Sequence, residues 1–143
     1  MQISTLGREH LSGVAQIERE CFSQPWSEQA LEILLADNAV AVVAVLDGGV
    51  AAYAGMTCVL DEGQITNVAT LPSFRRRGLA RTVLDELVAR ARERGVHSIF
   101  LEARVSNTPA ISLYKSLGFC EIGTRRRFYS APVEDAVLME LKI

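Results

Sequence analysis

Cysteine and histidine are scarce in this sequence, which limits the covalent and metal cross-links available to it. The 143 residues include three cysteines and two histidines. Cys21, Cys58 and Cys120 are widely spaced and form no Cys-x-x-Cys pair, while His10 and His97 each stand alone. Disulfide frameworks and zinc sites need such residues in closer, paired spacing. We therefore expect no disulfide framework and no metal site, as is typical of a protein in the reducing cytoplasm.

Long hydrophobic runs and an excess of one charge are also missing. The longest apolar run, Ala39–Leu46, is far shorter than the ~20 residues that a membrane-spanning helix needs. Residues 1–10 lack the apolar core of a signal peptide. The formal net charge is -2 at pH 7, whereas domains that coat nucleic acid are typically strongly basic. The sequence therefore predicts a cytoplasmic protein without a membrane partner or a direct nucleic-acid partner.

What the sequence does contain is a regular succession of strand and helix patterns. Hydrophobic residues make up 49% of the chain and charged residues 22%, which suits one folded domain over residues 1–143. Alternating or β-branched runs predict strands over 2–6, 39–46, 50–60, 63–71, 98–103, 119–129 and 135–143, and helical apolar spacing predicts helices over 10–21, 27–35, 78–95 and 107–117. We expect an α/β (α+β) fold with a mixed, mostly antiparallel sheet of about seven strands and helices on both faces.

Two local signals mark boundaries within this order. Asp47, Gly48 and Gly49 separate two β-branched runs and tolerate positive φ, so they predict the turn of an antiparallel hairpin. Ser27 precedes the second helical pattern and can cap it.

Three arginines at 75–77 directly precede Gly78 and the start of the clearest helical pattern. The first N–H groups of a helix lack partners within it, and the helix dipole places partial positive charge there. Arginines and a glycine at this point favour a phosphate-binding site. The alternative is a solvated basic helix start, which the spacing alone leaves equally open. A second triplet at 125–127 has no glycine and no following helix, so a solvated strand face is its simpler interpretation.

Arg75, Gly78 and Ala80 form an R-x-x-G-x-A pattern that resembles the R/Q-x-x-G-x-G/A signature of the GNAT superfamily of N-acetyltransferases. Ala80 stands where the second glycine of that signature is common. The predicted order of elements is also similar to the fold of that superfamily from end to end. The segments that look like its RimI-like group, the ribosomal-protein-alanine N-acetyltransferases, are PWSE at 25–28, NVATLPSFRRRGLAR at 67–81, LEARVSNTPAISLYKSLGF at 101–119 and the tail over 125–141.

The resemblance implies acetyl-coenzyme A (acetyl-CoA) as the cosubstrate, and no metal. In the family the arginine–glycine loop holds the pyrophosphate, and the N–H at the position of Val68 faces the acetyl carbonyl. The residues implied to bind acetyl-CoA are Val68, Ala69, Thr70, Arg75, Arg76, Arg77, Gly78, Leu79, Ala80, Arg81 and Asn107. For the cosubstrate to lie along this strand, we expect a β-bulge or a splay of the sheet near Asn67.

Acetyl transfer to an amine needs a proton acceptor for the amine and a proton donor for the departing thiolate. Glu102 lies in a predicted strand and points away from Leu101 and Ala103; an ion pair with a nearby arginine is the alternative for it. Tyr114 shares a predicted helix face with Asn107, although this pattern also suits a tyrosine in the core. The resemblance implies Glu102 as the general base and Tyr114 as the general acid.

The resemblance also implies the acceptor, which is the α-amine of an Ala-starting protein, small-subunit ribosomal protein eighteen. We expect substrate-binding residues at Pro25, Trp26 and Tyr129. An α-amine has a pKa of roughly 8, against about 10.4 for lysine, so a single carboxylate suffices to deprotonate it. Two alternatives stay open. One is a related enzyme that acts on lysine, a polyamine or another small amine, and the other is a noncatalytic module that binds CoA or nucleic acid.

Overall fold

A computed structural model describes all residues from Met1 to Ile143. Seven strands and three α-helices follow one another as β1 (Gln2–Thr5), α1 (Leu11–Cys21), β2 (Ala39–Leu46), β3 (Gly49–Val59), β4 (Glu62–Thr70), α2 (Leu79–Glu93), β5 (Ser98–Arg104), α3 (Thr108–Ser116), β6 (Cys120–Tyr129) and β7 (Glu134–Lys142). Three short 3-10 helices are η1 (Arg8–His10), η2 (Ala30–Leu35) and η3 (Pro72–Phe74). None of the helices combines the length and the apolarity that crossing a membrane requires. The predicted order of elements is confirmed, with one difference in the type of the second helix.

The strands form one mixed sheet in the order β1-β2-β3-β4-β5-β7-β6. Every neighbouring pair is antiparallel except β4 and β5, which run parallel. Helix α2 lies between those two strands in the chain and supplies the crossover that a parallel pair needs. Asp47 and Gly48 both have positive φ, 53° and 79°, and form the turn between β2 and β3. The predicted sheet and the predicted hairpin are therefore confirmed.

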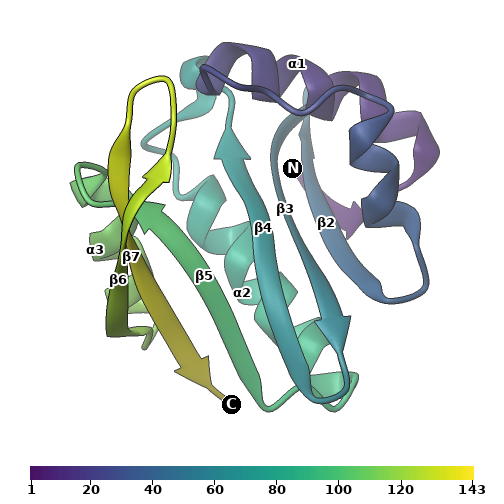
Figure 1. Cartoon of the computed structure of the whole chain (residues 1–143). Helices are drawn as coiled ribbons and strands as arrows, with labels where there is room; N and C mark the ends of the chain where they lie inside the picture. The colour runs from purple at the N-terminus through teal and green to yellow at the C-terminus, as the bar shows by residue number, and fades with distance from the viewer.

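The parallel pair β4–β5 is short, and this opens the sheet near its centre. Glu62–Gln64 of β4 pair with Ser98–Phe100 of β5, and the pairing stops there. Figure 1 shows the two strands separating toward their C-terminal ends. Beyond the last pair, one edge of β4 has no strand beside it, so its outward backbone groups are available to another molecule.

A β-bulge in β4 lies at the start of this opening. In the β3–β4 ladder, Asn67 pairs with Gly55. The next pair joins Ile65 to Met56, so Thr66 is an extra residue on the β4 side. An extra residue bends its strand and increases the local twist. The bulge and the splay expected near Asn67 are therefore both present.

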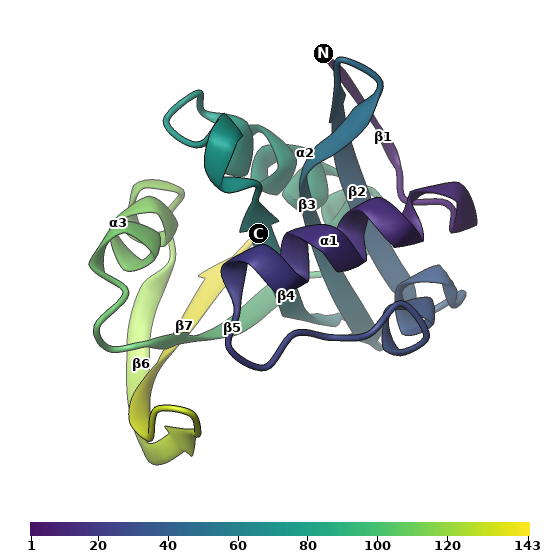
Figure 2. The same cartoon turned by 90° about the horizontal axis from the view of Figure 1, so that it is seen from above.

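Helices cover both faces of the sheet. Figure 2 shows α1 on one face, and α2 and α3 on the other. The buried residues of α2 follow helical spacing and pack into the larger core: Leu79, Val83, Leu84, Leu87 and Ala91. The core on the other face joins Leu11, Val14 and Ile17 of α1 to Val43 and Tyr53 of the sheet. Full burial of one such leucine contributes about 1.5–3 kcal/mol, so these two cores hold the strands that frame the opening.

The segment between α1 and β2 differs from the prediction. Apolar spacing predicts an α-helix over 27–35, whereas the chain forms the 3-10 helix η2. Ser27 still acts near its start, because its Oγ accepts a hydrogen bond from the backbone N–H of Ala30 at 3.1 Å. The two buried residues of η2 are Leu31 and Leu34. They are three positions apart, which is one turn of a 3-10 helix, so this tighter helix places both against the sheet.

Candidate active site

A cavity of about 540 Å³ lies at the opening between β4 and β5. Its walls come from the end of α1 and the loop after it, from β4, β5 and α3, and from the turn between β6 and β7. Six of the predicted site residues line it: Trp26, Val68, Glu102, Asn107, Tyr114 and Tyr129. The fold therefore brings both acid–base candidates and two of the acceptor candidates into one cavity.

The other predicted site residues lie outside this cavity. Pro25 is exposed, and Ala69 is buried in the core on the α1 face. Thr70 ends β4, and Arg75–Arg81 follow it beyond η3. Of the predicted cosubstrate residues, Val68 and Asn107 thus border the cavity, while the arginine–glycine segment forms a separate surface at the start of α2.

Glu102 is half-buried near the end of β5, between the buried Leu101 and Ala103. Its carboxylate Oε2 accepts a hydrogen bond from Nε2 of Gln64 at 2.8 Å. Its carboxylate takes no part in an ion pair; Arg104, two residues further along the strand, pairs with Glu134. The ion-pair alternative for Glu102 is therefore wrong, and the carboxylate is held by a neutral amide at the wall of the cavity.

Gln64 was not predicted as a site residue. It lies at the last paired position between β4 and β5, opposite Phe100. Side chains two residues apart on a strand share a face, which places Glu102 on the same face as Phe100. Only the register of the two strands brings the amide to the carboxylate. No signal in the local sequence around Gln64 could have shown this contact.

Tyr114 both packs against the core and lines the cavity. Its ring packs edge-on against Phe119, with ring centroids 5.8 Å apart, and it also lines the cavity. Burial, with a smaller contribution from Tyr129, raises the pKa of Tyr114 to about 12. The phenol therefore keeps its proton throughout the neutral pH range, as a hydrogen-bond or proton donor must.

Helix α3 presents Tyr114 to the cavity through a well-capped start. Asn107 is the N-cap, and its Oδ1 accepts a hydrogen bond from the backbone N–H of Ala110 at 3.3 Å. Pro109 stands in the first turn, where a missing N–H costs nothing. Asn107, Ala110 and Tyr114 all line the cavity, which confirms that they share one helix face.

The start of α2 exposes its first backbone N–H groups. Gly78 is the N-cap in the left-handed region, with φ of 76°, and no side chain caps the helix. A Cβ added at Gly78 would meet no atom within 4 Å, so the space above these amides is open. Helix-start N–H groups and the helix dipole together favour an anion at such a position.

The surrounding arginines are exposed and differ in their contacts. Arg75 donates to Sγ of Cys21 at 3.3 Å, and the guanidinium of Arg77 lies 5.1 Å from the centroid of the Phe74 ring. Arg81 donates to Oγ of Ser116 at 2.8 Å and so links α2 to α3 across the opening. The positive charge gathers around the uncapped helix start.

Trp26 and Tyr129 both line the cavity. Trp26 lies in the loop after α1, and Tyr129 is the last residue of β6. The ring of Tyr129 packs edge-on against Phe128, with centroids 5.0 Å apart, and only Tyr129 of this pair lines the cavity. Burial, and then the negative charge of Glu102, raises the pKa of Tyr129. Two of the three residues expected to bind the acceptor, Trp26 and Tyr129, thus line the cavity, and Phe128 packs against Tyr129.

A buried carboxylate, Glu18, fixes the loop that carries Trp26. Its Oε1 accepts a hydrogen bond from the backbone N–H of Trp26 at 3.0 Å, and its Oε2 accepts one from the hydroxyl of Tyr53 at 2.5 Å. Burial, together with this nearby carboxylate, raises the pKa of Tyr53. Glu18 was not predicted as a site residue, although a carboxylate on the buried stripe of a helix, beside Ile17, is a signal that could have identified it.

Asn67 is the one residue here whose buried side-chain oxygen has no partner. Its Oδ1 is buried without a hydrogen bond, and the residue lines the cavity next to the bulge at Thr66. Buried polar atoms are nearly always paired, and an orphan acceptor costs free energy. A donor group of a bound molecule would remove that cost.

Comparisons with known proteins agree with this geometry. The sequence profile of the acetyltransferase (GNAT) family matches residues 11–119. The ribosomal protein bS18-alanine N-acetyltransferase of Salmonella typhimurium is 39% identical over 143 residues, which covers 99% of this chain and 97% of that protein. The similarity therefore extends over nearly the full length of both chains.

Solved structures give the same result for the fold. The crystal structure of the ribosomal-protein-S18-alanine N-acetyltransferase from Escherichia coli superposes with a TM-score of 0.93 at 37% identity, covering 99% of this chain and 93% of that one. The ribosomal-protein-alanine N-acetyltransferase from Brucella melitensis superposes with a TM-score of 0.87 at 25% identity, covering all of both chains. The split sheet and its cavity thus lie in a fold that these enzymes share.

Proposed function

This chain belongs to the acetyltransferase (GNAT) family and is an N-acetyltransferase, and from this premise we propose that it acetylates the α-amine of ribosomal protein bS18, which begins with alanine. The observation that supports this best is the cavity where the sheet splays, which is lined by Glu102 from β5 and Tyr114 from α3. Relatives that match nearly the whole chain are named for this acceptor. The alternative acceptors, lysine, a polyamine or another small amine, would have to enter the same cavity on its acceptor side.

The residues present fit acetyl-CoA as the cosubstrate. Acetyl-CoA supplies an activated acetyl group, a negatively charged pyrophosphate and an amide-bearing arm. The uncapped start of α2 at Gly78, with Arg76 and Arg77 beside it, suits the pyrophosphate. The unpaired edge of β4 at Val68 suits the arm, because outward backbone groups there can bond to it as to an added strand.

Glu102 and Tyr114 would carry the two proton transfers. Glu102, held by Gln64, accepts the proton of the amine directly or through a water molecule. An α-amine loses its proton about 2.4 pKa units more readily than a lysine side chain, which corresponds to about 3 kcal/mol. The protonated phenol of Tyr114 donates to the departing thiolate from the other side of the cavity. Backbone N–H groups of β4 near Val68 would stabilise the acetyl oxygen.

The acceptor peptide would enter between Trp26 and Tyr129. Both side chains line the cavity and come from segments that only the fold brings together. The Trp26 backbone is fixed by Glu18, and the ring of Tyr129 is fixed by Phe128 and Arg104. A passage with such rigid aromatic walls favours an extended chain end with a small first residue over a bulky side chain.

A competition assay tests the acceptor. The protein is incubated with acetyl-CoA and three acceptors: a peptide with the first residues of ribosomal protein bS18, the same peptide with a blocked N-terminus and an internal lysine, and spermidine. Mass spectrometry then locates the acetyl group. We expect acetylation of the free N-terminus only. Equal or better acetylation of the blocked peptide or of spermidine would refute the proposed acceptor and leave the family assignment intact.

A further inference from the structure

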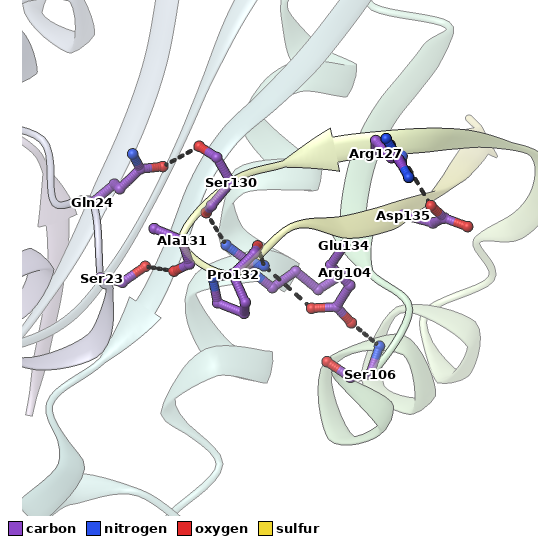
Figure 3. Close-up of polar contacts among 10 residues, drawn as sticks. All are labelled: Ser23, Gln24, Arg104, Ser106, Arg127, Ser130, Ala131, Pro132, Glu134 and Asp135. Atoms are coloured by element: carbon purple, nitrogen blue, oxygen red, sulfur yellow. Dashed lines mark hydrogen bonds and ion pairs between the residues drawn. The ribbon is translucent and has the colours of Figure 1, made fainter.

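Arg104 is the centre of a polar network at the turn between β6 and β7. Its Nη1 donates to the carbonyl of Pro132 at 2.9 Å and to Oε1 of Glu134 at 3.2 Å. Its Nη2 donates to the carbonyl of Ser130 at 3.1 Å. Figure 3 shows the guanidinium reaching from β5 into the turn. One planar side chain thus holds both ends of the turn, which a guanidinium can do because its donors have a fixed fork geometry.

The same guanidinium lies over Tyr129. Its central carbon is 4.5 Å from the centroid of the ring, within the range of a cation–π contact. Arg104 also lies two residues after Glu102 on β5, so the two side chains share a face of the strand. Arg104 therefore connects the strand of the proposed base to the aromatic wall of the acceptor side.

Glu134 extends the network to the start of α3. Its Oε2 accepts a hydrogen bond from the backbone N–H of Ser106 at 2.7 Å (Figure 3). Ser106 immediately precedes Asn107, the N-cap of the helix that carries Tyr114. The ion pair between Arg104 and Glu134 thus joins β5, the start of α3 and the β6–β7 turn at one point.

Two further contacts tie the turn to the opposite side of the cavity. The hydroxyl of Ser23 donates to the carbonyl of Ala131 at 2.6 Å, and the hydroxyl of Ser130 donates to Oε1 of Gln24 at 3.1 Å (Figure 3). Ser23 and Gln24 lie in the loop that carries Trp26 and also line the cavity. These contacts connect the β6–β7 turn to the loop that carries Trp26, on the acceptor side of the cavity. On its other side, the turn is held by Arg104 of β5.

We propose that Arg104 and Glu134 act as a positioning pair that fixes Tyr129 and the β6–β7 turn for binding of the acceptor peptide. The proposal rests on the acetyl transfer to a peptide N-terminus proposed above. Neither residue contacts the start of α2, where the pyrophosphate would bind. Loss of the pair therefore weakens acceptor binding and leaves cosubstrate binding unchanged. Loss of the ion pair displaces the acceptor wall, while an oxygen at position 134, of Glu or Gln, still accepts from Ser106 and keeps the start of α3 in place. The effect therefore falls on KM for the peptide and not on kcat.

The test uses Arg104→Met, Glu134→Gln and the double variant. Met keeps much of the volume of Arg104 without its donors, and Gln keeps the shape of Glu134 without its charge. Arg92→Met is the matched control, since Arg92 is an exposed arginine of α2 outside the cavity. We expect Arg104→Met to raise KM for the peptide about tenfold, with kcat and KM for acetyl-CoA within about twofold of the wild type. The double variant should lose no more than Arg104→Met alone, because the two residues act as one unit.

A lysine at the same position separates charge from geometry. Arg104→Lys keeps the positive charge but cannot reach the carbonyls and the carboxylate together. We expect a KM for the peptide between those of the wild type and Arg104→Met. A general loss of folding would lower kcat and affect both substrates, whereas a positioning role gives this graded change in KM for the peptide alone.

Amide hydrogen exchange of residues 130–135 gives a readout that needs no activity. We expect faster exchange there in Arg104→Met and Glu134→Gln, with α2 unchanged. Unchanged exchange, or faster exchange with an unchanged KM for the peptide, would overturn the proposal. If Arg104→Met does not fold, the milder Glu134→Gln decides the outcome. If the wild type acetylates only another amine, the proposed acceptor fails, and the same KM comparison with that amine still decides whether the pair positions the acceptor side.

Discussion

Gly78 combines two properties that no other residue type offers at the start of α2. It occupies the left-handed region at φ of 76°, and it leaves the first N–H groups of the helix open. A side chain at such a φ costs roughly 1–2 kcal/mol because its Cβ approaches the backbone. Gly78 was predicted to bind the cosubstrate from its place after three arginines, and this role stays a prediction. The left-handed conformation is an addition from the structure.

Gly78→Val should weaken binding of acetyl-CoA more than about tenfold, which corresponds to about 1.4 kcal/mol. The valine side chain would stand over the helix-start amides and shift their direction. Isothermal titration calorimetry measures the affinity. Gly95→Val is the matched control, since Gly95 also has positive φ, 90°, and open space around it, but lies at the other end of α2. If Gly78→Val and Gly95→Val bind acetyl-CoA with the same affinity, Gly78 is not part of the binding site.

Glu102→Gln should lower kcat by about 10²–10⁴, because the amide cannot accept the proton of the amine. Its size is unchanged, so binding of acetyl-CoA should persist. Gln64→Leu removes the donor that holds the carboxylate at 2.8 Å and should give a smaller loss of kcat through misalignment. Steady-state kinetics with saturating acetyl-CoA measures both. A wild-type kcat in Glu102→Gln would show that water or another group takes the proton.

Tyr114→Phe should slow turnover while keeping the fold, because the edge-on contact with Phe119 survives loss of the hydroxyl. The pKa of Tyr114 is raised to about 12, so the wild-type phenol stays protonated and its ionisation should cause no loss of activity up to about pH 10. The rate of CoA release, followed with a thiol reagent between pH 7 and pH 10, checks both statements. An unchanged rate in Tyr114→Phe would leave only the core role for this residue.

At the scale of elements, the site is made by the ends of strands and by the connections that follow them. Glu102 and Arg104 lie at the end of β5, and α3 begins four residues after Arg104. The β6–β7 turn contacts Arg104, and Glu134 at the start of β7 contacts Ser106, just before α3. Strand ends and loops carry function because a rigid sheet fixes their positions while their side chains are free to vary. Glu134 is the point where these three elements meet.

The titration of Glu134 should report this junction. Hydrogen bonding from Ser106, aided by Arg104, holds the pKa of Glu134 below its usual range. A lowered pKa means that the junction stabilises the fold above the ordinary carboxyl pKa, about 4.3, and that this contribution disappears as the pH falls through the lower folded value. The amide chemical shift of Ser106, followed by NMR from pH 7 downward, should therefore change with a midpoint below about 4.3. Glu134→Gln should abolish this transition. A midpoint at or above about 4.3 would show that Ser106 and Arg104 do not stabilise the Glu134 carboxylate.

At the scale of the whole molecule, the sheet is continuous at one end, where β4 pairs with β5, and splayed at the other. β1–β4 with α1 lie on one side of the opening, and β5–β7 with α3 lie on the other (Figure 1). Helix α2 packs against β2, β3 and β4. The contact of Arg81 with Ser116 is a link across the opening between α2 and α3. A cosubstrate in this opening would contact both sides and add to the interactions that hold them together.

Acetyl-CoA at about 100 times its Kd should therefore stabilise the fold by about 2.7 kcal/mol. For a domain of this size the melting temperature should rise by several degrees. Differential scanning calorimetry measures this rise, and Gly78→Val serves as the control that should show little of it. A rise of the same size in Gly78→Val would place the binding site elsewhere.

The order of the strands and most of the helices could be predicted from local sequence patterns alone. Periodicity and turn residues are local, so the strands, the helix start at Gly78 and the hairpin at Asp47 could be predicted from neighbours in the chain. Glu102 and Tyr114 were selected as acid–base candidates because the segments around them resemble the GNAT family. The fold places both at one cavity. Their roles stay predictions until the variants are measured.

The contacts that hold these residues come from long-range packing, which local sequence patterns do not contain. Gln64 meets Glu102 across 38 positions of sequence, Glu18 meets Tyr53 across 35, and Arg104 meets Glu134 across 30. Such contacts depend on strand register, on the bulge in β4 and on which face each helix covers, and none of these is encoded in a short window of sequence. The 3-10 form of η2 was likewise not predicted from its apolar spacing; its buried Leu31 and Leu34 belong to the same core as Val43 and Tyr53 of the sheet. Local physical chemistry thus set the elements, and long-range packing set the geometry of the site.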